Sequence, residues 1–281
     1  MGDRLRPLWN FRDLDATEAR FRALLGGDDR AEVLTQLARV EGLRGDFPAG
    51  ERLLAEAEER RDEGSAVAAR VALERGRLLR SAGDPRAALP LFERAFEIAL
   101  AAGEAFIAVD AAHMAALAVS DHHAIFGWTR RAMELAGESD DAEVRYWLGP
   151  LENNLGWEHH GRGEYEAALA AFRRALEARE QRPEQPAEIE LARYSIGKTL
   201  RALGRADEAV ALLEQAVAWA QSKGEPDGWF HEELAEEYAA LGRAAQAGEQ
   251  ARLALPLLLE ADPGFEADEE RSARLRALAD L

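Results

Sequence analysis

Residues 152–178, ENNLGWEHHGRGEYEAALAAFRRALEA, predict two helices joined by a short turn. Apolar residues recur at helical spacing on both sides of Gly161 and Gly163, which interrupt the pattern. Small residues such as Gly156 are expected where two crossing helices touch, and large ones such as Phe172 where the space between helices must be filled. One hairpin of this kind cannot bury its own apolar face. The stretch therefore predicts neighbouring hairpins of the same design.

The rest of the chain repeats this layout of a small residue on the first helix, a glycine at the turn and small residues on the second helix. The third copy deviates, because Ser120 replaces the turn glycine and His113 replaces the small residue of the first helix. Successive turn residues are 37 to 43 positions apart. The six predicted hairpins occupy residues 34–59, 71–99, 106–136, 152–178, 192–220 and 229–258.

Both ends of the chain are predicted to cap this array. Asp15 or Thr17 is expected to begin a short N-terminal helix, and Trp9 and Phe11 are expected to pack against the first hairpin. Near the other end, leucines at helical spacing predict a last helix that covers the sixth hairpin. The expected organisation is an all-α protein with an N-terminal lead-in and capping helix over residues 1–30, a repeat domain over 31–260 and a C-terminal capping helix over 261–281.

Composition narrows the function classes. The formal net charge is −18, from 53 acidic and 35 basic side chains, and this charge disfavours binding to nucleic acid or to anionic membranes. The chain has no cysteine, which excludes disulfides, thiolate metal sites and a cysteine nucleophile. No apolar run has the length of a signal-peptide core or of a membrane span. A cytoplasmic location is expected.

The repeated offsets resemble those of the tetratricopeptide repeat (TPR) family, over about residues 34–258. The long repeat spacing is similar to that of kinesin-light-chain-like repeats. The segments DAAHM, LENNLGW and DGWFHEELAE also resemble stand-alone bacterial TPR proteins of unassigned function. The resemblance implies a right-handed solenoid in which the first helix of each hairpin lines a concave groove, and a protein or peptide partner that binds in this groove.

The resemblance selects the groove-facing positions of the first helices. Several of them are basic although the chain as a whole is acidic, so an acidic peptide segment is the expected ligand. The alternative is that Arg77, Arg80 and Arg201 pair with glutamates on adjacent helices. The candidate groove residues are Thr35, Arg39, Arg77, Arg80, Asp110, Met114, Asn153, Asn154, Trp157, His160, Tyr194, Lys198, Arg201, Trp229, Glu232 and Glu236.

Some of these residues have a more specific expected role. Asn153 and Asn154 are similar to asparagines with which TPR domains hold a peptide backbone, although Asn154 could instead bond within the stack. The carboxylate clamp of the family is not matched, because its lysine and asparagine would fall at Asp110 and Met114. Trp157 is a candidate aromatic anchor, and so is Trp229, while packing between helices is the alternative for each.

Catalysis has little support in the sequence. The histidines do not form an HExxH motif, and adjacent histidines on a helix point in different directions. No phosphate-binding glycine motif occurs, and no cofactor or metal is expected. The first hypothesis is a non-catalytic interaction module, and the second is a ligand-responsive regulator that acts through a partner protein. The third is an enzyme that uses Asp110, His113, Asn153 and His160.

Overall fold

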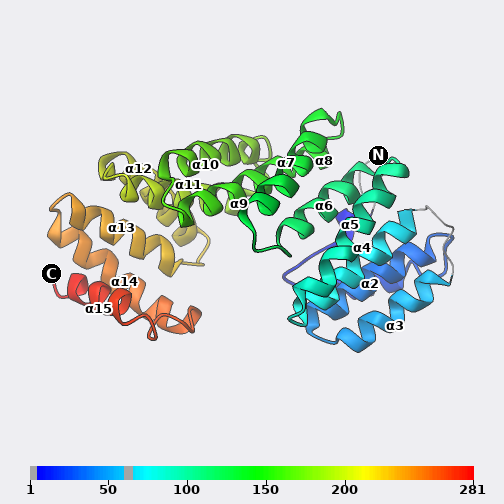
Figure 1. Ribbon diagram of the computed structural model, residues 1–281. Helices are drawn as coiled ribbons and strands as arrows, with labels where there is room; N and C mark the ends of the chain where they lie inside the picture. Colours follow the sequence, from blue (N-terminus) through cyan, green and yellow to red (C-terminus); the bar gives the residue numbers. More distant parts are fainter. Residues whose placement is uncertain (1–4, 60–65) are drawn as a thin grey trace. The chain divides into compact units, whose positions relative to one another are not determined.

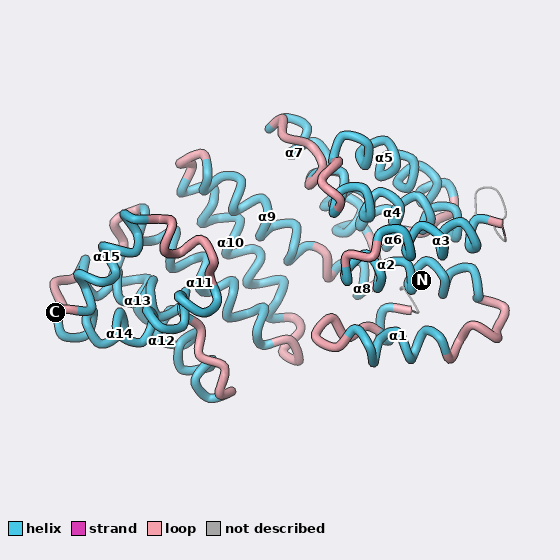
Figure 2. Tube along the Cα trace, turned by 90° about the horizontal axis from the view of Figure 1, so that it is seen from below, coloured by secondary structure: helices cyan, strands magenta, loops and turns pink. Residues whose placement is uncertain are grey.

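The computed structural model describes residues 5–59 and 66–281, and all regular structure in these ranges is helical (Figure 2). Residues 1–4 of the expected lead-in lie outside the described ranges. The chain divides into two compact units, which we call unit 1 (Met1–Leu151) and unit 2 (Glu152–Leu281). Each unit consists of helix hairpins that follow one another along the chain (Figure 1).

Unit 1 begins with a short 3-10 turn and one helix, continues with three hairpins and ends with a one-turn helix and the start of the next helix. Its elements are η1 (Arg6–Leu8), α1 (Leu14–Arg22), α2 (Arg30–Arg44), α3 (Phe47–Glu58), α4 (Ala66–Ser81), α5 (Pro85–Ala101), α6 (Ala105–Ala116), α7 (His122–Glu138), α8 (Ala142–Arg145) and the first residues of α9 (Leu148–Gly161).

Unit 2 contains three hairpins, the first of which is formed by the rest of α9 and by α10, followed by one helix that packs against α13 and α14. This last helix covers the end of the array, as the sequence predicts for a C-terminal cap. The further elements are α10 (Tyr165–Glu180), α11 (Pro186–Ala202), α12 (Ala206–Ser222), α13 (Gly228–Ala240), α14 (Ala244–Ala261) and α15 (Glu269–Ala279).

Helices pack in two ways within each unit. Helices that follow one another along the chain are in contact, within hairpins such as α4–α5 and α13–α14, and between hairpins from α3 to α4, α5 to α6, α10 to α11 and α12 to α13. In addition, the first helices form a layer of their own, in which α2 contacts α4 and α4 contacts α6. In unit 2, α11 contacts α13 in the same way. This layer is the surface on which the sequence places the candidate groove residues.

Glycine at the helix crossing allows the two helices of a hairpin to approach closely. A Cβ atom on Gly76 would lie 2.5 Å from the ring of Phe92, and one on Gly156 would lie 2.5 Å from the ring of Phe172. Both phenylalanines are fully buried. The crossing residues are sixteen positions apart in both hairpins, so the pairing of a small with a large residue is confirmed as a repeated packing rule.

The turns separate the third hairpin from the other five. The turn glycines of those five hairpins adopt positive φ angles, between 70° and 92°, a backbone region that glycine enters without steric cost. In the third hairpin, no residue from Leu117 to Asp121 has a positive φ, and Asp121 caps α7 by accepting a hydrogen bond from the backbone N–H of Ala124. The sequence did not predict α8, which lies between this hairpin and α9.

The N-terminal helix begins earlier than the sequence indicates. Asp13, and not Asp15 or Thr17, caps α1 by accepting from the backbone N–H of Ala16 at 2.9 Å. Thr17 lies within α1 and is buried. Its hydroxyl donates to the backbone carbonyl of Asn10 in the lead-in. Trp9 packs edge-on against Phe21 of α1 and bonds to α2, as expected for a residue that packs against the first hairpin.

Candidate functional site

Two clusters of charged side chains lie in the layers of first helices, one in each unit. The unit 1 cluster is centred on Arg77 of α4, and the unit 2 cluster on Glu233 of α13. Both central side chains are largely withdrawn from solvent. A buried charge is tolerated only when oppositely charged neighbours and hydrogen bonds compensate it, so each cluster determines which further groups its surface can accept.

Arg77 is held between two buried carboxylates. Its Nη1 donates to Oε1 of Glu74, one turn earlier on α4, at 2.7 Å, and its Nη2 donates to Oδ1 of Asp110 on α6. Burial alone raises the pKa of Asp110, but the nearby Arg77 and Arg39 outweigh burial, and the net pKa of this carboxyl is below its usual value. Asp110 is therefore an ionised partner of Arg77.

His113 does not supply a charge to this cluster. Burial lowers the pKa of His113 to about 4, although Asp110 opposes the shift, so the imidazole is neutral at physiological pH. Its ring lies at a centroid distance of 5.3 Å from the ring of Trp147, in a tilted arrangement. His113 is therefore a neutral packing residue at the position where the other hairpins have a small residue.

A cavity of about 180 Å³ lies beside the unit 1 cluster, between α2, α4 and α6. Three residues that the sequence places in the groove, Arg39, Arg77 and Met114, line it together. They come from three successive first helices, which is the arrangement that the repeat pattern predicts. The other lining residues are Gly42, Leu43, Glu74, Leu78 and Ser81.

The lead-in fixes one wall of this cavity. The guanidinium of Arg39 lies 5.1 Å from the ring of Trp9 and 5.4 Å from the ring of Phe11, and the two rings are stacked on each other. Trp9 is itself held because its Nε1 donates to Oε1 of Gln36 on α2 at 2.9 Å. Cation–π contact of this kind orients the guanidinium of Arg39 at the wall of the cavity.

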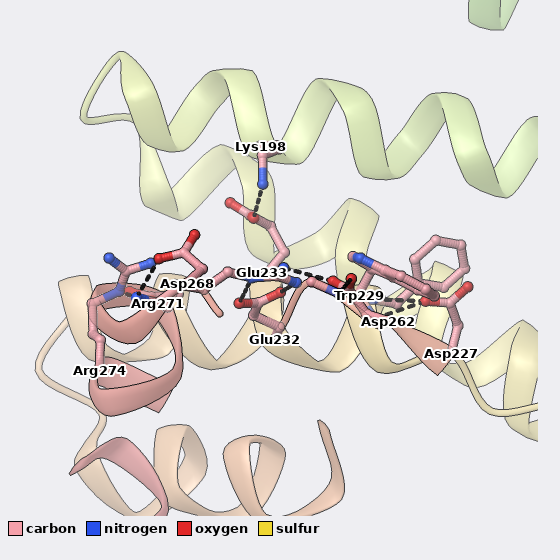
Figure 3. A network of polar contacts seen from close by, with 12 residues as sticks. Lys198, Asp227, Trp229, Glu232, Glu233, Asp262, Asp268, Arg271 and Arg274 are labelled. Carbon is pink, nitrogen blue, oxygen red and sulfur yellow. Dashed lines mark hydrogen bonds and ion pairs between the residues drawn. The ribbon is translucent and has the colours of Figure 1, made fainter. Parts of the chain in front are cut away.

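The unit 2 cluster links α11 to α13 (Figure 3). Lys198 extends from α11 toward Glu233, with 3.4 Å between Nζ and Oε2. Arg201, one turn later on α11, donates to both carboxylate oxygens of Glu233. The side chain of Glu233 is 2% exposed, so a nearly buried carboxylate carries two cations of the preceding hairpin.

The last helix neutralises the rest of the acidic face of α13. Arg271 of α15 makes a bidentate pair with Glu232, at 2.6 Å for each contact, and also donates to Asp262 at 2.8 Å (Figure 3). Arg274 donates to Glu236. The two acidic groove candidates of the sixth hairpin, Glu232 and Glu236, are thus paired with arginines of the C-terminal cap.

Glu237 is the exception on this face. It is fully buried, and neither of its carboxylate oxygens has a hydrogen-bond partner. Burial and the neighbouring Glu233 raise its pKa to about 8, with Arg201 opposing the shift and Glu236 adding to it. This carboxyl is therefore mostly protonated at neutral pH.

The remaining candidates of unit 2 are mainly aromatic residues in packed positions. Trp157 lies edge-on to Phe172 at 5.0 Å and to His160 at 5.4 Å. Burial and then Lys198 lower the pKa of His160, against the effect of Glu233. The other candidates are Tyr194, tilted against Phe230 at 5.6 Å, Trp229, which packs on the core formed by α13 to α15, and the half-buried Asn153 and Asn154.

The ion pairs of the groove arginines separate two explanations of these residues, ligand binding and pairing with carboxylates of adjacent helices. Arg77 and Arg201 pair with carboxylates of their own or the adjacent first helix, as the alternative explanation states. Arg80 does not follow it, because its Nε donates to the backbone carbonyl of Leu117 at 3.2 Å. Thr35 is buried and donates to the carbonyl of Glu32, within its own helix.

The carboxylates of Glu74 and Glu233, which hold the two charged clusters together, were not predicted from the sequence. Glu74 and Glu233 occupy the same repeat position, two residues before the small residue at the helix crossing. That position was not among the groove candidates, although Glu74 stands three residues before Arg77, a spacing that places both on one helical face. Arg271 was not predicted either, because the leucine spacing that predicts the last helix carries no information about its charged residues.

Neither metal binding nor membrane insertion has structural support in residues 5–59 and 66–281. Within these ranges no three histidine or acidic side chains are grouped so that they could hold a metal ion. None of the helices described here combines the length and the apolar character that crossing a membrane requires.

Three segments of the chain match family models with the description tetratricopeptide repeat. They are residues 29–101, 153–182 and 192–223, which include hairpins from both units. No curated protein matches the sequence of this chain.

Several solved structures share the fold at low sequence identity. The apo form of RapI has a TM-score of 0.73 and 14% identity, over 98% of this chain and 79% of RapI. BtubC from P. vanneervenii has a TM-score of 0.61 and 19% identity, over 79% of this chain and 93% of BtubC. Aspartyl phosphate phosphatase F from Bacillus subtilis has a TM-score of 0.61 and 15% identity, over 99% of this chain and 78% of the phosphatase. Each likeness concerns the fold alone.

Proposed function

Because the chain is a tetratricopeptide repeat protein, we propose that it is a non-catalytic interaction module that binds an extended segment of a partner protein along its first helices. Repeats of this family generally mediate protein–protein interactions through such surfaces. The observation that carries the proposal is the cavity of unit 1. It is open to a ligand, and successive first helices contribute the residues that line it.

Charge favours an acidic segment in unit 1. Three guanidinium groups, those of Arg39, Arg77 and Arg80, stand against the two carboxylates of Glu74 and Asp110. An acidic side chain can therefore approach this surface without meeting a net negative charge, and a guanidinium offers it paired N–H donors.

The corresponding surface of unit 2 offers less to an anion. The four cations Lys198, Arg201, Arg271 and Arg274 each have a carboxylate partner in the unit. An acidic ligand would have to displace these internal pairs, and displacement of a buried pair leaves an uncompensated charge. We therefore assign the acidic segment to unit 1 and not to unit 2.

The test is a titration with labelled peptides. A short peptide of aspartate, glutamate and serine is expected to bind the full chain, and the same peptide with lysine in place of the acidic residues is not. Arg80→Glu is expected to weaken binding by about tenfold, since it reverses a half-buried charge at the edge of the cluster.

Arg94→Glu is the matched control, because Arg94 is exposed on α5, a second helix, and carries the same charge change. If both variants weaken the acidic peptide equally, net charge and not the inner surface of unit 1 determines binding, and the proposal is wrong. Equal affinity for the acidic and the basic peptide would also contradict it.

A further inference from the structure

The lead-in is described over residues 5–12, and this part contacts the first and the last of the three first helices in unit 1. The Nε1 atom of Trp9 donates to Oε1 of Gln36 on α2 at 2.9 Å. Three residues earlier, the guanidinium of Arg6 lies 5.3 Å from the centre of the Phe106 ring on α6. α4 contacts both α2 and α6, and the second helices cover the other side of this layer. The lead-in therefore lies over the inner surface of unit 1, from the first hairpin to the third.

The lead-in contacts the same repeat positions that form the charged cluster. Gln36 and Arg39 of α2 hold the repeat positions that Glu74 and Arg77 hold on α4, 38 residues further along the chain. The α4 pair forms part of the unit 1 cluster, and the α2 pair contacts Trp9. Equivalent positions of successive hairpins lie on the same face of a repeat stack. The lead-in therefore occupies the face on which the proposed ligand-binding residues stand.

Arg39 is shared between the lead-in and the cavity of unit 1. It lines the cavity, and its guanidinium also lies beside the rings of Trp9 and Phe11. An extended segment that follows the first helices from α2 to α6 needs the surface on which the lead-in lies. Two segments cannot fill the same space, so the lead-in and a bound partner segment exclude each other at Arg39 and beyond it.

The contacts that hold the lead-in are individually weak. The Nε atom of Arg6 is 3.4 Å from Oε2 of Glu143 on α8, but the two side chains are 29% and 39% exposed, and an ion pair this exposed adds little stability. Among residues 5–12, Leu5 is the one buried side chain, and the three-residue η1 is the one regular element. A segment with so few buried groups opens more readily than the packed helices do, so the lead-in is suited to move when a ligand competes for its surface.

We propose that the lead-in is an autoinhibitory segment, which covers the inner surface of unit 1 and has to leave it before a partner segment makes its full contacts with the first helices. The inference rests on the proposed function, which it deepens by naming how the binding surface is regulated. In this arrangement the apparent affinity for a partner is reduced by the fraction of molecules in which the lead-in is still in place.

The experiment uses Arg6→Glu in the full chain and the acidic peptide of aspartate, glutamate and serine. The change places a second carboxylate beside Glu143 and removes the cation from the rings of Phe106 and Tyr146, so it releases the lead-in. Affinity for the acidic peptide is expected to rise about fivefold, because the competent fraction increases. An effect of net charge alone has the opposite sign, since the variant is more negative than the parent.

Arg12→Glu is the matched control. Arg12 is exposed, belongs to the same segment and undergoes the same change of charge. This variant is expected to bind the acidic peptide as tightly as the parent or more weakly. If Arg6→Glu binds the peptide no more tightly than Arg12→Glu does, the lead-in does not inhibit binding and the inference is overturned.

Hydrogen exchange on the unaltered full-length chain provides a second measurement. In η1 and at its end, the backbone N–H groups of Leu8 and Trp9 donate to the carbonyls of Leu5 and Arg6, at 3.1 and 3.0 Å. A saturating amount of the acidic peptide is expected to speed exchange of these two amides, and the peptide with lysine in place of the acidic residues is not. Exchange that stays the same or slows with the acidic peptide bound means that the lead-in remains in place, which overturns the inference.

Failure of the inference is distinguishable from failure of the proposed function. If the acidic peptide binds in an Arg80-dependent manner but Arg6→Glu brings no gain in affinity, the autoinhibitory role is wrong and the interaction surface stands. If the acidic peptide binds neither the parent nor Arg6→Glu, the proposed acidic ligand is wrong, and the autoinhibitory role is wrong with it.

Discussion

The two charged clusters occupy equivalent repeat positions but use them in opposite ways. In unit 1, Glu74 and Arg77 lie on one helix, and Asp110 of the next first helix completes the set. In unit 2, cations reach the acidic helix α13 from α11 before it and from α15 after it. The repeat fixes where the side chains stand, while the residue types decide which cations between the helices are engaged by internal carboxylates. A cavity lies beside each cluster, and the one in unit 2, of about 390 Å³, is lined by Arg201 and by the ends of α11 to α13.

The two clusters therefore differ in what they offer to a ligand. Unit 1 has a cavity lined by Arg39, Arg77 and Met114 beside its charged cluster. In unit 2 the carboxylates Glu232, Glu233 and Glu236 each have an arginine partner, and Glu237 remains buried and protonated. We therefore regard the unit 1 cluster as a binding surface and the unit 2 cluster as a structural one.

The largest effect on stability is expected from Arg77→Ala. This change leaves Glu74 and Asp110 as buried carboxylates without their shared cation, which costs about 3–5 kcal/mol in the free energy of unfolding of unit 1. Urea denaturation measures the loss, and Arg94→Ala, at an exposed site, is the control. A loss no greater than that of the control would mean that the cluster does not depend on Arg77.

A smaller effect is expected from Glu237→Gln, and it should depend on pH. The pKa of about 8 lies above the value of 4.5 usual for a free glutamate, so the folded state holds a proton that the unfolded state releases. The contribution of Glu237 to stability is therefore fully present below about pH 4.5 and is lost as pH rises through about 8.

Glu237→Gln should remove this decline, which a pKa difference between 4.5 and about 8 makes a few kcal/mol in size. Denaturation of unit 2 at several pH values between 5 and 9 tests the expectation, with Glu260→Gln at an exposed position of α14 as control. A variant whose stability declines with pH as steeply as that of the parent would contradict the assigned pKa.

The smallest effect is expected from Arg201→Ala. Glu233 keeps Lys198 as a partner, and the side chain of Arg201 is 31% exposed, so water can replace part of the lost contact. The expected loss is about 1 kcal/mol. If Arg201→Ala destabilises unit 2 as much as Arg77→Ala destabilises unit 1, the contrast between the two clusters does not hold.

The hairpins and their caps could be predicted from the sequence because their determinants are local. Gly76 and Phe92 recur at a fixed offset in the repeat, and the turn glycines mark where each hairpin reverses. The one-turn helix α8 was missed because four residues are too few to show a helical period. Asp13 was passed over as the cap of α1 in favour of later residues with the same capping chemistry.

The charged clusters were predictable only in part. The groove positions Arg39, Arg77 and Met114 follow from the repeat and do line one cavity. Their partners do not follow from it, because Arg77 meets Asp110 across 33 residues and Arg201 meets Glu233 across 32. Which side chains meet over such separations depends on how neighbouring hairpins pack, and a single repeat pattern does not contain that information.

The central claim is that a partner segment binds the first helices of unit 1. The most direct measurement is amide chemical-shift mapping of the full-length protein with the acidic peptide added. The account predicts shifts that concentrate on α2, α4 and α6, at Gly42, Ser81 and Met114 in particular, with α3 and α5 little affected. Shifts confined to α3 and α5, or to unit 2, would contradict it.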